Sequence, residues 1–190
     1  LQPEPKRVLM VGLSIGSWLA LVEGFPNIEH IDVVEINAGY LEAVQAYSAQ
    51  ANALKNPKVN IVIDDARRWL TRHPDKQYDL IIMNTTCSFL LSAEFLQIIK
   101  NHMNPGAVMT FNTTGSADAF YTASTVFEHA YRYSNFVYAA QFDFRERKDH
   151  NDAKQIWQSL EVDGTPLFTA NDPLIEKYLN GSFIPIELVQ

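Results

Sequence analysis

The chain has 190 residues, 47% hydrophobic and 19% charged, so it has enough apolar surface to build a folded core and is not intrinsically disordered. No apolar run approaches the roughly 20 residues that cross a bilayer, and the opening LQPEPKR is not a signal peptide, so we expect a cytoplasmic protein unless a membrane tether lies outside this segment. The net charge of −7 argues against nucleic acid as a partner, and the single cysteine, Cys87, excludes an internal disulfide.

Short β-branched apolar runs alternate with longer amphipathic stretches, a pattern typical of βα units around a largely parallel sheet. Strands are expected at 7–12, 30–36, 58–63, 78–83 and 107–112, with at least one more in 136–144. Helices are expected at 17–24, 38–50, 67–71, 92–103 and 117–130. The sequence therefore predicts an α/β fold with a mostly parallel sheet.

The chain is predicted to form a core at 1–145 and a C-terminal appendage at 146–190 that packs on the same domain. The most polar stretch, 146–155, is interpreted as a surface connection into this appendage, which includes a predicted helix at 172–180.

Ligands of an open α/β sheet bind beyond the carboxyl ends of its strands, so the residues that follow each strand are the candidates for a site. The first strand is followed by Gly12-Leu13-Ser14-Ile15-Gly16-Ser17, in which the glycines allow the backbone to approach a ligand and Ser17 is placed to cap the next helix. It is neither the GxGxxG dinucleotide fingerprint nor a P-loop. A purely structural need for glycine is the alternative explanation of this turn.

Acidic residues follow the next two strands. Glu35 stands nineteen residues after Gly16, where a carboxylate can accept both hydroxyls of a ribose. Asp65 and Ala66 follow the third strand, where an acid beside a small residue suits the exocyclic amine of a flat base, although Asp65 is equally placed to cap a helix. The ordered series of glycine turn, ribose acceptor and base acceptor predicts a nucleoside site.

The segments VLMVGLSIGSWLA, HIDVVEIN, NIVIDDARRWL, YDLIIMN and LLSAEFLQIIKNHMNPGAVMTFNT resemble the spermidine and spermine synthases, which have the class I S-adenosylmethionine-dependent methyltransferase fold. The resemblance extends from about residue 7 to 115. It implies a Rossmann-like, mostly parallel seven-stranded sheet with helices on both faces.

The resemblance also implies roles for individual residues. Gly12 and Gly16, with Ser14 between them, would line the amino-acid-like tail of the nucleoside. Glu35 would hold the ribose, and Asp65 with Ala66 the adenine. Decarboxylated S-adenosylmethionine or S-adenosylmethionine would be a co-substrate, with no tightly bound cofactor, and a polyamine and a homodimeric partner are compatible with it.

Three residues depart from the family pattern. Ile15 and Asn84 each stand where the family has an aspartate, and Leu91 stands where it has a tyrosine. The second of these aspartates takes the proton from the attacking amine, a step that the carboxamide of Asn84 cannot perform. Asn84 and Thr85 would instead orient the acceptor, with its proton lost to water or to another side chain.

Asn84-Thr85-Thr86 and Asn112-Thr113-Thr114 follow two strands that should be neighbours, so they are expected either to face one mouth of a site or to be ordinary loop exits. The five histidines are scattered over different elements, and no metal site is predicted. The leading hypothesis is a spermidine synthase-like aminopropyltransferase with altered catalytic residues. The alternatives are an S-adenosylmethionine-dependent methyltransferase and a non-catalytic nucleoside-binding domain of a larger protein.

Overall fold

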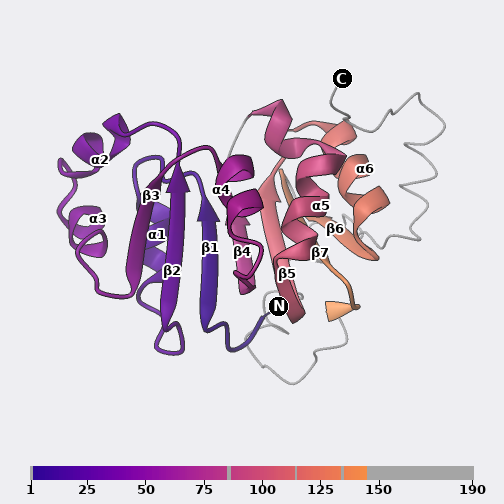
Figure 1. Cartoon of the computed structure of the whole chain (residues 1–190), viewed down its shortest axis with the longest axis horizontal. Coiled ribbons are helices and arrows are strands. Elements are labelled where there is room, and N and C mark those ends of the chain that lie inside the picture. Colours follow the sequence, from indigo (N-terminus) through magenta and orange to yellow (C-terminus); the bar gives the residue numbers. More distant parts are fainter. Residues whose placement is uncertain (1, 85–86, 114, 134, 145–190) are drawn as a thin grey trace.

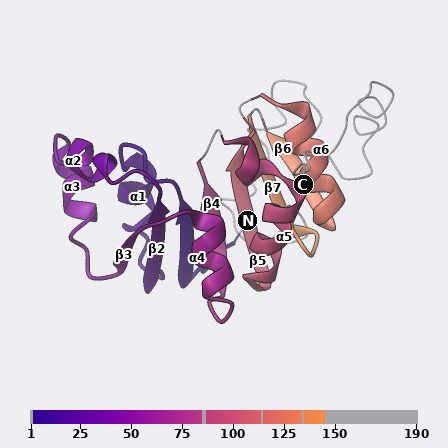
Figure 2. The same cartoon turned by 45° about the horizontal axis from the view of Figure 1, so that its top comes forward.

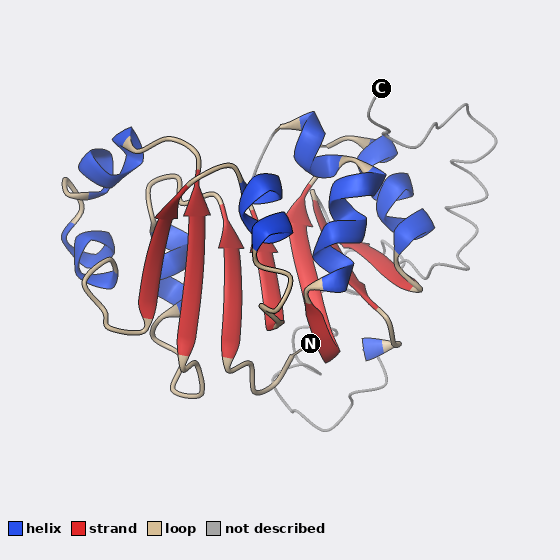
Figure 3. Ribbon diagram, viewed as in Figure 1, coloured by secondary structure: helices blue, strands red, loops and turns tan. Residues whose placement is uncertain are grey.

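The strands of the described residues form one sheet whose order is β3-β2-β1-β4-β5-β7-β6. The structure is a computed structural model that describes residues 2–84, 87–113, 115–133 and 135–144. The strands are β1 (Arg7–Val11), β2 (His30–Glu35), β3 (Val59–Ile63), β4 (Tyr78–Met83), β5 (Met103–Asn112), β6 (His129–Tyr133) and β7 (Phe136–Ala140). The pairings among β1 to β5 are parallel, whereas β7 is antiparallel to both β5 and β6. The predicted mostly parallel, seven-stranded sheet is therefore confirmed (Figure 3).

Helices cover both faces of this sheet. They are α1 (Ser17–Val22), α2 (Gly39–Val44), α3 (Ser48–Ala53), α4 (Ala66–Arg72), α5 (Ala93–Asn101) and α6 (Ala117–Val126), with a 3-10 turn, η1 (Ser88–Leu91). Figure 1 shows α4 and α5 in front of the sheet and α1 behind it, and Figure 2 shows α5 and α6 side by side. No helix in the described ranges is both long enough and apolar enough to span a membrane.

Each face of the sheet has its own buried core, because successive side chains of a strand point to opposite faces. In β1, Leu9 and Val11 pack with α4, α5 and α6, whereas Val8 and Met10 pack with α1 on the other side. The strands in the middle of the sheet are covered on both faces, which explains why β1 and β4 are almost continuously apolar in sequence.

Two predicted helices differ from the observed ones. The helix expected at 38–50 is divided into α2 and α3, because Tyr47 has the extended dihedral angles φ −120° and ψ 108°. The division lets Val44 of α2 and Ala53 of α3 enter the same core cluster. The helix expected at 117–130 ends at Val126, since the segment from His129 instead pairs with β7 as strand β6.

The fifth strand begins earlier than predicted. The sequence predicts that Pro105 and Gly106 turn the chain into the strand, but they lie within β5, where the pairing with β4 is irregular between Tyr78 and Leu80. The predicted appendage at 146–190, including the helix at 172–180, lies outside the described residues and stays a prediction.

Candidate functional site

The carboxyl ends of β1, β2 and β4, together with the turn between β3 and α4, surround one cavity of about 890 Å³. Figure 3 shows why these segments meet, since the arrowheads of the parallel strands lie at the same end of the sheet. Six of the eight predicted site residues line the cavity: Gly12, Ser14, Glu35, Asp65, Ala66 and Asn84. Of the other two, Gly16 is buried and does not line the cavity, and Thr85 lies outside the described residues.

The turn after β1 requires left-handed backbone at three positions. Gly12 has φ 90° and Gly16 has φ 76°, both in the region that favours glycine, and Ser14 adopts φ 51°. A Cβ atom on Gly12 would lie 2.8 Å from the carbonyl oxygen of Asn84, so the close approach of the turn to the end of β4 also requires glycine there. At Gly16 a Cβ atom would lie 3.3 Å from Cβ of Gln50, which shows that this glycine serves the packing of α1 on α3. Ser17 does not cap α1 as expected, because the N-cap position is Gly16.

Glu35 is the most buried acid of the cavity. Its side chain is 4% exposed, and its Oε2 accepts the N–H of Leu13 at 2.7 Å while its Oε1 accepts the N–H of Asn37 at 2.8 Å. Each carboxylate oxygen thus has one backbone donor, and the remaining lone pairs are available to hydroxyl groups of a ligand. The same bonds tie the end of β2 to the glycine turn after β1.

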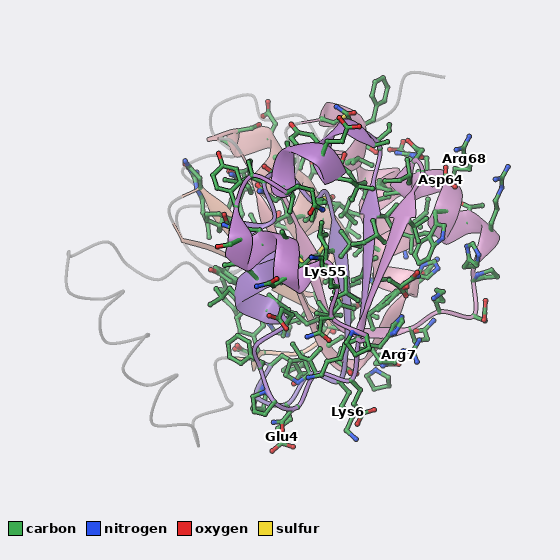
Figure 4. The ribbon with its side chains drawn as sticks, turned by 90° about the vertical axis from the view of Figure 1, so that its left-hand side faces the viewer. Glu4, Lys6, Arg7, Lys55, Asp64 and Arg68 are labelled. Carbon is green, nitrogen blue, oxygen red and sulfur yellow. The ribbon has the colours of Figure 1, made fainter. Side chains whose placement is uncertain are left out.

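Asp65 combines both roles that its position in the sequence suggests. Its side chain is the N-cap of α4 and accepts the N–H of Arg68 at 2.9 Å, and the residue also lines the cavity. The neighbouring Asp64, which is not among the predicted site residues, lines the cavity as well and forms an ion pair with the side chain of Arg68. Hydrogen bonding from Arg68 holds the pKa of the Asp64 carboxyl below its ordinary value. Figure 4 shows Asp64 and Arg68 together at one end of the sheet, with Arg7 near the other.

The end of β4 provides a polar but uncharged part of the wall. Asn84 is half-buried, and its backbone N–H donates to the carbonyl of Val11 at 3.1 Å, which fixes it beside the glycine turn. Asn112 and Thr113, the described residues of the other predicted triplet, do not line this cavity. Thr113 is buried, and both its N–H and its Oγ1 donate to the carbonyl of Asn135, so it anchors the loop after β5 to the β6–β7 hairpin.

Large apolar side chains at the mouth are not among the predicted site residues. Ile36 and Phe89 line the cavity although they are 72% and 63% exposed, and Tyr40 and Leu90 line it too. Ile36 follows Glu35 directly, so its place at a strand end was the signal that could have found it. Arg67 also lines the cavity. Within the described ranges, no group of three or more histidine, cysteine, aspartate or glutamate side chains is arranged to hold a metal ion.

Comparison with known proteins points to one family. The spermine/spermidine synthase domain matches residues 1–140 of this chain. The polyamine aminopropyltransferase of Pectobacterium carotovorum subsp. carotovorum (strain PC1) is 33% identical over 110 residues, which are 54% of this chain and 38% of that protein. Putrescine N-methyltransferase 2 of Nicotiana attenuata is 27% identical over 113 residues, 56% of this chain and 30% of that protein. The chain thus spans less than half the length of either relative.

Solved structures show the same fold. The spermidine synthase of Thermotoga maritima superposes with a TM-score of 0.73 at 20% identity, covering 94% of this chain and 70% of that one. A spermidine synthase in complex with the transition-state analogue AdoDATO gives a TM-score of 0.64 at 22% identity, covering 78% of this chain and 61% of that one. Human methyltransferase-like protein 13 in complex with SAH gives 0.64 at 20% identity, covering 94% and 90%. The predicted class I methyltransferase fold is confirmed by these likenesses, which at such identities concern the fold alone.

Proposed function

The chain belongs to the spermine/spermidine synthase domain family, and on that premise we propose that its cavity binds decarboxylated S-adenosylmethionine or S-adenosylmethionine as a co-substrate. The observation that carries the proposal is the buried, doubly hydrogen-bonded carboxylate of Glu35 in a cavity shared with Asp65 and Ala66. Glu35 accepts hydrogen bonds from the ribose hydroxyls. Asp65 accepts a hydrogen bond from the exocyclic amine of adenine, whose flat ring lies against Ala66. Gly12 and Ser14 lie along the tail of the nucleoside.

The reaction that we propose is aminopropyl transfer to a polyamine. The nitrogen lone pair of the acceptor attacks the carbon next to the sulfonium, the new C–N bond forms as the C–S bond breaks, and the sulfur leaves as a neutral thioether. The positive charge moves to the nitrogen, which then loses a proton. Because the leaving group is already activated, positioning contributes much of the rate.

Asn84 and Thr85 orient the acceptor in this proposal. A carboxamide donates and accepts hydrogen bonds but has no basic lone pair at neutral pH, so water or another side chain receives the proton. We therefore expect turnover to be slower than in an enzyme with a carboxylate at this position.

A methyltransferase is the second candidate. It is favoured by the similarity to putrescine N-methyltransferase 2 and by the uncharged wall that Asn84 contributes to the cavity. The third candidate is a nucleoside-binding domain without catalysis, for which the loss of a general base at Asn84 is the argument.

Thermal melting with three ligands separates these candidates. A ligand at about 100 times its Kd stabilises a protein by about 2.7 kcal/mol, so binding is readily seen. We expect stabilisation by decarboxylated S-adenosylmethionine, S-adenosylmethionine and methylthioadenosine, and product formation from putrescine, spermidine or agmatine with one of the two sulfonium donors. Binding without turnover would favour the non-catalytic candidate, and the absence of any stabilisation would refute the proposed site.

Replacing Asn84 by aspartate tests the altered chemistry. If the cavity is a synthase site without its base, Asn84→Asp should raise kcat for aminopropyl transfer by about 10²-fold or more, in the range that general base catalysis contributes. The Kd of methylthioadenosine, which has no acceptor amine, should stay unchanged and is the control. An unchanged kcat would contradict the role given to Asn84.

A further inference from the structure

We propose that Arg67 is a positioning residue that holds the segment 87–91 in place as one wall of the nucleoside cavity. The inference rests on the nucleoside binding proposed above. Arg67 is the second residue of α4, and its Nη2 donates to the carbonyl oxygen of Phe89 at 2.8 Å and to Oγ of Ser92 at 3.1 Å. Its guanidinium carbon also lies 5.6 Å from the ring centre of Phe95, so the group is held on three sides.

The placement of Phe89 within this segment depends on the contact with Arg67 because the regular structure around Phe89 is short. The turn η1 comprises four residues, and the N–H of Leu90 donates to the carbonyl of Cys87 at 3.0 Å. A 3-10 turn has poorer hydrogen-bond geometry than an α-helix and little stability of its own. Leu91 at the end of the segment is 3% exposed and packs in the core, but the side chain of Phe89 is 63% exposed, so burial contributes little to holding Phe89. Ser92 adds a bond from its Oγ to the carbonyl of Phe89 at 2.9 Å, on the same oxygen that Arg67 contacts.

The position of Arg67 connects this wall to the base-binding end of the cavity. Asp65 and Ala66 precede Arg67 directly, and all three line the cavity together with Phe89 and Leu90. The contact therefore joins the helix that would hold adenine to the neighbouring segment 87–91, which lines the same cavity. If this contact is broken, the wall is in its binding position for a smaller fraction of the time, and the apparent Kd rises by the inverse of that fraction.

Arg68 and Arg72 show that this role is specific to one arginine of α4. Arg68 forms an ion pair with Asp64, which lies just before the N-terminus of α4, and Arg72 is exposed in the last turn of the helix. Arg72→Gln is thus a matched control that removes one positive charge from α4 without touching η1.

The test compares Arg67→Met, Arg67→Lys and Arg72→Gln with the unchanged chain of 190 residues. The Kd of methylthioadenosine is measured by calorimetry, the stability of the free protein by urea unfolding, and the hydrogen exchange of peptides that cover 87–92 and β1 by mass spectrometry. For Arg67→Met we expect a Kd about tenfold higher, since one charge-assisted hydrogen bond contributes on the order of one such factor. Exchange should be faster at 87–92 and unchanged in β1. Arg67→Lys keeps the positive charge and a donor group but not the planar fork, so its Kd should lie between those of Arg67→Met and the unchanged chain. Arg72→Gln should bind as the unchanged chain does.

Three results would overturn the inference. The first is an unchanged Kd in Arg67→Met despite lowered stability, which is the signature of a purely structural contact. The others are hydrogen exchange at 87–92 that is the same in Arg67→Met as in the unchanged chain, or a loss of affinity in Arg72→Gln as large as that in Arg67→Met. If Arg67→Met does not fold, Arg67→Lys decides by the same criteria. A chain that in its unchanged form binds no adenosyl compound would instead refute the proposed function, and the exchange of 87–92 in the ligand-free variants would still decide whether Arg67 holds this segment.

Discussion

Replacing Glu35 by glutamine perturbs the residue on which the proposed nucleoside site most depends. The carboxylate accepts the N–H groups of Leu13 and Asn37 at 2.7 and 2.8 Å and is 4% exposed. Glutamine keeps one acceptor oxygen but turns its NH₂ group toward the other backbone N–H, which then has no partner. Hydrogen bonds to charged groups contribute about 1.5–3 kcal/mol, and an unsatisfied buried donor costs about 1–3 kcal/mol. We therefore expect the free energy of unfolding of Glu35→Gln to fall by about 2–4 kcal/mol, as measured by urea unfolding.

The same substitution has a second, ligand-specific effect. If Glu35 accepts the ribose hydroxyls, the unchanged protein should bind methylthioadenosine about tenfold more tightly than its 2′-deoxy analogue. Glu35→Gln should bind both compounds weakly and should have lost most of this preference. Calorimetry with the two compounds measures it independently of the loss of stability. A preference of the same size in both proteins would refute the assignment of Glu35 to the ribose, whatever their absolute affinities.

Two further predictions concern stability. Gly12→Ala should destabilise the protein by about 1–3 kcal/mol, because the residue has φ 90° and its Cβ would lie 2.8 Å from the carbonyl oxygen of Asn84. The control is Gly24→Ala, whose Cβ would lie at an ordinary 3.5 Å from the backbone, so it should be neutral or slightly stabilising. Equal melting temperatures of the two variants would contradict this prediction. Burial alone would raise the pKa of the Asp32 carboxyl, but hydrogen bonds from Lys76 and three other side chains outweigh it and lower the pKa from 3.8 to about 2. The lowered pKa contributes about 2 kcal/mol to the free energy of unfolding, a contribution that is fully present above about pH 5 and is lost as the pH falls through 2. In urea unfolding, the difference in the free energy of unfolding between pH 6 and pH 3 should therefore be smaller for Asp32→Asn than for the unchanged chain.

The mostly parallel sheet and six of the residues that line the cavity could be predicted from the sequence, because both follow from local patterns. Apolar runs such as those of β1 and β4 must be buried on both faces, and alternation with helices makes the strands parallel. Parallel strands bring their carboxyl ends to one edge of the sheet. For that reason Gly12, Glu35 and Asp65, which are far apart in the sequence, could be expected at one site from their places at successive strand ends.

Tertiary structure decided the features that depend on contacts between distant segments. The strand β6 exists because it pairs with β7, and the helical pattern up to residue 130 does not contain that information. The break at Tyr47 and the burial of Gly16 against Gln50 arise from the packing of α3 on α1. An exposed apolar residue such as Ile36 cannot be distinguished from a core residue by its type, and the bond from Arg67 to Phe89 joins residues that are 22 positions apart. Periodicity along the chain reports which side of an element is buried, whereas the partner that buries it is set by the fold as a whole.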